Sequence, residues 1–222
     1  VMIAFTVCVN YSDFFSLCFP RNVKHLERWV LITSLQDPVR KIVENCPKVQ
    51  LLFFPDFGQP GVQFKKYAAL NWALEQVRPR GWVAFLDADV LLPRIVRWPQ
   101  KPGYLYSPIR RNLDPITVPL PEVWNSCPIH PYSQVGYSGH LQIVHAQDPI
   151  LHGKGFRWFT EIDHAGAGDT LFEQLWPADR KTRPDFEILH LGSPRQFWRG
   201  RTTLLLFGEG GIIERKPFLS IL

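Results

Sequence analysis

Cysteine is scarce in this 222-residue sequence, and its four cysteines are too far apart for the usual metal or redox motifs. Cys8, Cys18, Cys46 and Cys127 form no C-x-x-C pair, so neither a zinc knuckle nor a thioredoxin-type site is supported. So few thiols in a chain of this length favour reduced core cysteines of a cytoplasmic protein, although the even number leaves disulfides open.

Long apolar runs are also missing. No such run approaches about 18 residues, the length that a membrane-spanning helix requires, so we expect no transmembrane segment. The first nine residues, VMIAFTVCV, are apolar but too short to cross a bilayer, and they lack the basic start of a signal peptide. They favour a buried strand.

The sequence has no long Lys/Arg tail, although its net charge is +5. Its basic residues gather in four short segments, at 78–82, 109–112, 178–183 and 194–201. Such a balance fits either a solvated basic surface or an anionic partner such as a nucleotide, a polyphosphate or nucleic acid. Hydrophobic residues make up 45% of the chain, which supplies a substantial core and argues against disorder.

The first half of the chain alternates between short apolar runs and helix-like segments. Strands are expected at 2–9, 28–34, 49–54 and 82–86, and helices at 37–46, with Asp37 as N-cap, and at 61–77. Nearly continuous apolar strands suit a parallel sheet that is buried on both faces. This order predicts an α/β domain with a mostly parallel central sheet.

The second half is richer in proline-containing loops. It suggests short strands within 103–109, 136–146 and 186–192, and a helix that begins with Asp169 as its N-cap. One domain with two subregions is expected, in which residues 1–93 bind a nucleotide and residues 94–222 bind an acceptor.

Two aspartates end the fourth expected strand, in the segment GWVAFLDADVLLP at 81–93. In an extended chain Asp87 and Asp89 point to the same side, where two carboxylates repel each other unless a cation lies between them. Carboxylate oxygens suit Mg²⁺ or Mn²⁺. The alternative is a strand-to-loop turn in which both aspartates cap backbone amides.

An apolar strand followed by D-A-D resembles the D-x-D motif of glycosyltransferases with the GT-A fold, in which the motif follows the fourth strand of a nucleotide-binding α/β half. The resemblance implies that Asp89 binds a metal ion, and that Asp87 contacts the donor ribose or a metal-bound water. The layout is also similar to that of small bacteriophage transferases, some of which glycosylate hydroxymethylated bases in DNA.

Other segments extend the resemblance. The helix before D-x-D carries Lys66 and Asn71, with Tyr67 where the family often has glycine. The resemblance implies that both residues bind the donor, with Lys66 at its phosphates; the alternative for Lys66 is a solvated lysine at the edge of the helix. His190 in the H-x-G context completed by Gly192 is implied as a further metal ligand, and Arg195, with Arg199 and Arg201, as a diphosphate contact. The end of the first strand is implied to hold the nucleoside, through residues Thr6, Val7, Asn10, Tyr11 and Asp13.

The implied activity is transfer of a sugar from a nucleoside-diphosphate donor, with UDP first, to a hydroxyl acceptor, using Mn²⁺ or Mg²⁺. A 5-hydroxymethylated pyrimidine in DNA is one acceptor; a saccharide or a lipid is the alternative. Asp169 is the first candidate base and Asp163 the second.

The loop at 136–139 is expected to approach the donor sugar, and Trp158 and Phe159 to offer an acceptor platform or core packing. A nucleotidyltransferase and a non-catalytic nucleic-acid- or sugar-binding module remain as alternatives. The first strand is not followed by the glycine-rich basic loop that a nucleotidyltransferase usually has.

Overall fold

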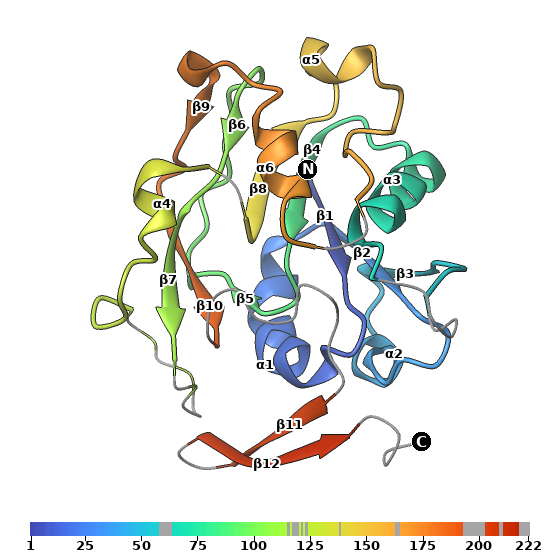
Figure 1. The fold of residues 1–222 in the computed structure, drawn as a ribbon, viewed down its shortest axis with the longest axis vertical. Coiled ribbons are helices and arrows are strands. Elements are labelled where there is room, and N and C mark those ends of the chain that lie inside the picture. The colour runs from blue at the N-terminus through green and yellow to red at the C-terminus, as the bar shows by residue number, and fades with distance from the viewer. Residues whose placement is uncertain are drawn as a thin grey trace.

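The computed structural model of the protein describes most of the chain (Figure 1). The described residues are 1–57, 64–114, 116, 120, 122, 124–137, 139–162, 165–192, 203–208 and 211–217. For 203–208 and 211–217 the description covers the backbone alone.

The core of the fold is a seven-stranded sheet in the order β3-β2-β1-β4-β8-β6-β9. Its parallel half consists of the four strands expected in the first half of the chain: β1 (Met2–Val7), β2 (Arg28–Thr33), β3 (Val49–Phe53) and β4 (Trp82–Leu86). Next to β4 the direction reverses. The remaining strands are β8 (Leu141–His145), β6 (Leu105–Tyr106) and β9 (Lys181–Thr182). The predicted α/β fold with a mostly parallel central sheet is confirmed.

Helices cover both faces of this sheet (Figure 1). On one face, α1 (Ser12–Asn22) and α2 (Val39–Val43) pack through Phe15 and Val39 into one core cluster. On the other, α3 (Lys66–Val77) and α6 (Gly168–Glu173) pack through Leu70 and Phe172 into a second.

Helix α1 was not among the predicted helices. The polar segment NYSD, in which it begins, is typical of a turn, but Phe14, Phe15 and Cys18 all turn inward and are buried. Burial of this apolar face outweighs the weak local signal, and Pro20 lies near the end of the helix.

Two expected helix starts differ in detail. Pro38, rather than Asp37, is the N-cap of α2, although Asp37 Oδ1 still accepts from the Val39 amide at 2.9 Å. The N-cap of α6 is Ala167, so Asp169 lies in the first helical turn and the prediction that it caps the helix is wrong.

A second, three-stranded sheet in the order β5-β10-β7 stands beside the carboxyl end of β4. It contains β5 (Val90–Leu91), β10 (Glu187–Leu191) and β7 (Ile109–Leu113). In this sheet His190 pairs with Val90, so β10 lies beside the D-A-D segment although it comes about 100 residues later in the chain.

Short elements complete the described part. They are η1 (Val23–His25), α4 (Tyr132–Val135), α5 (Pro149–His152), η2 (Ala178–Arg180), and a hairpin of β11 (Thr203–Gly208) and β12 (Gly211–Pro217). Among the described residues, none of the helices has the length and apolar character needed to cross a membrane. All four cysteines are free thiols.

Candidate active site

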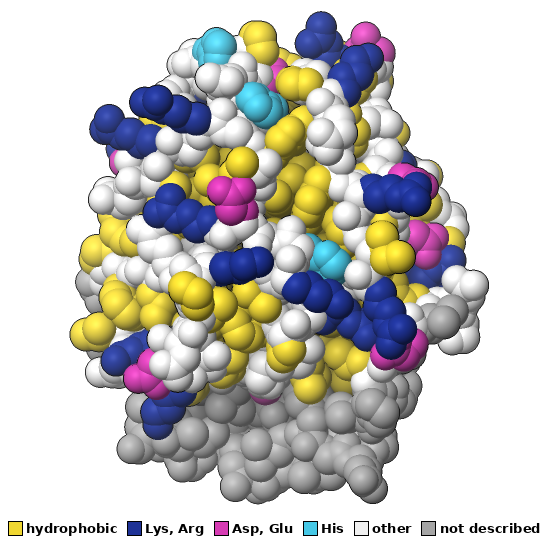
Figure 2. Space-filling model, turned by 180° about the vertical axis from the view of Figure 1, so that it is seen from behind, with side chains coloured by type: hydrophobic (Ala, Val, Ile, Leu, Met, Phe, Trp, Pro, Cys, Tyr) yellow, Lys and Arg dark blue, Asp and Glu magenta, His cyan; other side chains and the backbone are white. Residues whose placement is uncertain are grey.

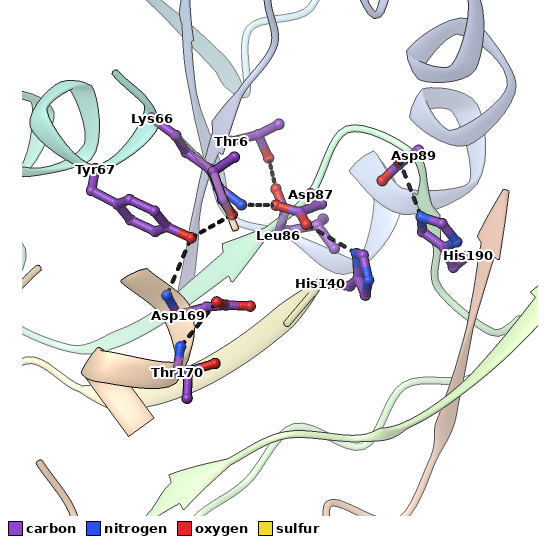
Figure 3. Close-up of polar contacts among 11 residues, drawn as sticks. Thr6, Lys66, Tyr67, Leu86, Asp87, Asp89, His140, Asp169, Thr170 and His190 are labelled. Carbon is purple, nitrogen blue, oxygen red and sulfur yellow. Dashed lines mark hydrogen bonds and ion pairs between the residues drawn. The ribbon is translucent and has the colours of Figure 1, made fainter. Parts of the chain in front are cut away.

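The site begins where β4 ends. Thr6 Oγ1 donates to the Leu86 carbonyl at 2.6 Å (Figure 3). The same oxygen accepts from Trp29 Nε1 at 2.9 Å. Thr6 is 1% exposed, so its hydroxyl holds three neighbouring strands together rather than facing a ligand. This contact fixes the strand end from which Asp87 and Asp89 project.

The two aspartates face different partners (Figure 3). Asp87 lies between two basic groups, with Oδ1 at 2.6 Å from Lys66 Nζ and Oδ2 at 3.0 Å from His140 Nδ1. Asp89 turns toward the late strand, where its Oδ2 is 3.4 Å from His190 Nε2. The two carboxylates therefore have different basic partners.

Asp89, His140 and His190 each offer a ligand atom, and these three atoms lie within 4.8 Å of one another. The two imidazole rings are 4.3 Å apart between centroids. One carboxylate and two neutral imidazoles form a chemically sensible donor set for a divalent ion. The buried His190 Nδ1 has no partner among the described residues. The residues present fit a metal ion.

His140 is the member of this cluster that the sequence did not reveal. It precedes β8, which pairs antiparallel with β4, and its carbonyl accepts from the Asp87 amide at 2.9 Å. The available signal was the histidine in YSGHLQ at the start of an expected strand, but no local pattern specifies that this strand lies beside β4.

A second polar group lies on the other side of Asp87. Tyr67 Oη donates to the Ala165 carbonyl at 2.9 Å and accepts from the Asp169 amide at 3.2 Å. A Cβ atom at Gly168 would lie 2.4 Å from the Tyr67 ring, so this close approach of α3 and α6 requires glycine. The tyrosine thus fixes the position of Asp169.

Burial and neighbouring charges determine the protonation of this group. Burial raises the pKa of Asp169; Lys66 opposes this shift and Asp87 adds to it. Burial lowers the pKa of Lys66, but Asp87, Tyr67 and Asp169 outweigh it and raise that pKa well above its ordinary value. Lys66 is therefore a stable cation.

One pocket is lined by His140 from the first group and by Lys66 and Asp169 from the second, together with Asp87, Gly139 and Val7. Asp89 and His190 are not among its lining residues. Of the five residues implied to hold the nucleoside, Val7 alone lines this pocket. The predicted site residues Lys66, Asp87 and Asp169 line it as well.

Other predicted binding residues have structural partners. Asn71 is 2% exposed and holds the backbone of Phe159, with Nδ2 donating at 2.9 Å and Oδ1 accepting at 3.0 Å. It stabilises the packing of α3. Trp158 and Phe159 are buried in the core, which excludes an open platform, although Phe159 is one of the residues that line the pocket.

Asn10, Tyr11 and Asp13 form the entry to α1. Asn10 has a φ of 62° and its amide donates to Asp37 Oδ2 at 2.6 Å. The ring centroids of Tyr11 and Phe14 lie 6.0 Å apart, and Asp13 Oδ1 accepts from the Phe14 amide. These residues therefore build a fixed turn at the carboxyl end of β1.

The end of β10 adjoins this turn. Gly192 has a φ of +91°, and a Cβ atom there would lie 3.8 Å from the Phe14 ring. Two segments predicted to hold the donor are thus neighbours. Asp163, Ser138, Arg195, Arg199 and Arg201 lie outside the described residues.

Comparison with known proteins gives a fold but no family. No family model and no curated protein matches the chain. A mycobacterial protein of known structure aligns with all of this chain and 88% of its own, with a TM-score of 0.51 and 11% identity. This likeness shows a shared fold alone.

Two enzyme structures align less well. An inositol-1-phosphate CTP transferase from T. maritima covers 86% of this chain and 89% of its own, at 11% identity and a TM-score of 0.48. The glycosyltransferase GlyE of Streptococcus pneumoniae TIGR4 aligns with 82% of this chain and 45% of its own, at 10% identity and a TM-score of 0.47. Neither of these two similarities is strong enough to assign an activity.

Proposed function

We propose that this protein is a metal-dependent glycosyltransferase that moves a sugar from a nucleoside-diphosphate donor, with a UDP-sugar as first candidate, to a hydroxyl acceptor. The observation that carries the proposal is the cluster of Asp89, His140 and His190 at the carboxyl end of β4. Open α/β sheets bind their ligands at this edge.

Asp89, His140 and His190 would hold the ion. When bound, Mn²⁺ or Mg²⁺ would supply a Lewis acid for the diphosphate leaving group. Two imidazoles in the donor set favour Mn²⁺, since Mg²⁺ prefers oxygen ligands and binds imidazole poorly. Asp87 holds His140 through Nδ1, which leaves Nε2 as the ligand atom.

Lys66 and Asp169 would act on the substrates. The Lys66 ammonium lies on the pocket wall, where it can offset the charge of a phosphate. Burial raises the pKa of Asp169, which makes its carboxylate a stronger base than an exposed aspartate and suits it to accept the acceptor's hydroxyl proton. As the acceptor oxygen bonds to the anomeric carbon, the bond to the diphosphate breaks, and the proton passes to Asp169.

Charge is the observation that bears on the acceptor class. A net charge of +5 favours an anionic acceptor such as hydroxymethylated DNA. On the face that Figure 2 shows, however, Lys and Arg lie in separate groups with acidic side chains among them, rather than as one stripe. A saccharide or lipid hydroxyl is accordingly the second acceptor class to test.

The experiment incubates the protein with Mn²⁺, a panel of nucleotide-sugars, and DNA, saccharide and lipid acceptors. Metal-dependent release of nucleoside diphosphate, with a matching mass increase of one acceptor, supports the proposal. The variants Asp89→Asn and His190→Ala should abolish that release. Release of pyrophosphate from a nucleoside triphosphate would indicate nucleotidyl transfer, and binding without turnover would indicate a binding module.

A further inference from the structure

Arg110 in β7 is a buried cation without a direct partner. It is 8% exposed, its Nε is buried and unsatisfied, and its guanidinium makes neither a hydrogen bond nor an ion pair with any residue that the structure describes. The next residue differs: Arg111 points to the opposite face of the strand, where its guanidinium binds Glu187 and the Cys127 carbonyl. Buried charges are normally paired, so Arg110 needs an explanation.

The guanidinium ends beside the proposed metal site. A Cβ atom at Gly139, the residue before His140, would lie 3.8 Å from Arg110 Nη1 and 3.5 Å from Asp169 Oδ2. On the other side, β7 pairs with β10 so that Asn112 stands next to His190. Arg110 therefore lies between the strand that carries one histidine and the loop that carries the other.

Nearby carboxylates do not fully compensate this charge. Burial lowers the pKa of Arg110 to about 10, although Asp89, Asp87 and Asp169 act in the opposite direction. Arg110 is still a cation at neutral pH. A divalent ion held by Asp89 would neutralise one of these carboxylates, which leaves the guanidinium with a greater need for an anionic partner.

We propose that Arg110 binds phosphate oxygens of the substrate beside Asp89, His140 and His190. This inference rests on the proposed function and adds a phosphate contact within the basic segment 109–112, in which the sequence alone does not distinguish Arg110 from Arg111. The planar guanidinium fork matches two phosphate oxygens, which a lysine ammonium cannot do. The same chemistry is offered by the donor diphosphate and by a nucleic-acid backbone, and the experiment separates them.

Calorimetric titration of the full chain measures binding of Mn²⁺ first, and then of inorganic pyrophosphate in saturating Mn²⁺ and in metal-free buffer. Arg110→Gln should weaken pyrophosphate binding by about 10- to 100-fold, because charge-assisted hydrogen bonds are lost. Arg110→Lys, which keeps the charge and secures the fold if the glutamine variant does not fold, should lose several-fold. Affinity for Mn²⁺ should hold or rise, and the control Arg111→Gln should bind pyrophosphate as the wild type does.

Short duplex DNA is titrated in parallel. If the Arg110 variants lose affinity for pyrophosphate alone, Arg110 binds the donor diphosphate. If they lose affinity for DNA alone, Arg110 binds the phosphate backbone of the acceptor. If both Arg110 variants bind both probes with wild-type affinity, or if the wild type binds neither, the inference is overturned and Arg110 is a counter-charge for the three carboxylates. If the wild type binds no Mn²⁺, the proposed function fails, while the metal-free titrations still decide the role of Arg110.

Discussion

Asp87 Oδ2 lies 3.0 Å from His140 Nδ1, while the other oxygen of the same carboxylate is 2.6 Å from Lys66 Nζ. One aspartate thus orients a histidine and holds a lysine, and its neighbour Asp89 stays with His190. This division gives the two carboxylates of the D-A-D segment separate tasks, and each task can be tested.

Asp87→Asn should weaken Mn²⁺ binding about 10- to 100-fold, because His140 loses the carboxylate that fixes its ring and its Nε2 lone pair. Calorimetric titration of Mn²⁺ measures the change. The matched control is Asp56→Asn, since Asp56 forms a similar 2.9 Å pair with Lys65 but lies outside the cluster of metal-ligating residues. Equal losses in both variants would contradict an orienting role.

His140→Ala should reduce the preference for Mn²⁺ over Mg²⁺, because it removes one of the two imidazoles and Mg²⁺ favours oxygen ligands. The ratio of the two dissociation constants measures this preference. His145→Gln, at the far end of β8, is the control and should keep the wild-type ratio. An unchanged ratio in the His140 variant would remove that residue from the ligand set.

Asp169→Asn should lower kcat by about 10²- to 10⁴-fold while the affinity for nucleoside diphosphate changes little, as expected for loss of a base. Asp163→Asn provides the comparison, because Asp163 is the second candidate. A large loss of kcat in the Asp163 variant, with full activity of the Asp169 variant, would transfer the role to Asp163.

Gly139→Ala should lower the free energy of unfolding by about 1–2 kcal/mol, because Gly139 has a φ of +93° that alanine rarely adopts. Gly153→Ala is the control: its φ is −70° and a Cβ atom there meets nothing within 4 Å, so it should be neutral or slightly stabilising. Urea denaturation measures both. Equal stability of the two variants would show that the loop before His140 tolerates a different backbone.

The parallel half of the sheet was predictable because each of its strands is a short apolar run between helices. The same runs placed Asp87 and Asp89 at the carboxyl end of β4, where parallel strands end together. His190 was predicted as a ligand from its H-x-G context, and the structure places it near Asp89 because β10 pairs with β5.

His140 and Arg110 could not be predicted in the same way. Their roles depend on the antiparallel pairing of β8 with β4 and on the register of β7 with β10, which no local signal specifies. Helix α1 was missed because its polar start resembles a loop, and its helical state depends on the burial of Phe14 and Phe15 against the rest of the fold. Asn71 was predicted from its place in the helix before D-x-D, but its side chain forms hydrogen bonds with the backbone of Phe159.

Asp37 joins the start of α2 to the Asn10 turn, because its carboxylate accepts from the Val39 and Asn10 amides. Burial raises its pKa, and the two amides only partly offset this shift. The folded state therefore holds the Asp37 proton more tightly than the unfolded state does. The resulting stabilisation is complete below the ordinary Asp pKa of about 3.9 and is lost as pH rises through the raised folded value.

The free energy of unfolding of the wild type, minus that of Asp37→Asn, should accordingly fall as pH rises from about 4 toward neutrality. Urea denaturation of both proteins at several pH values measures this difference, and the subtraction removes the titration of every other carboxyl group. A difference that stays level or grows with pH would show that the two amides, rather than burial, determine the protonation of Asp37 in the turn beside the proposed nucleotide site.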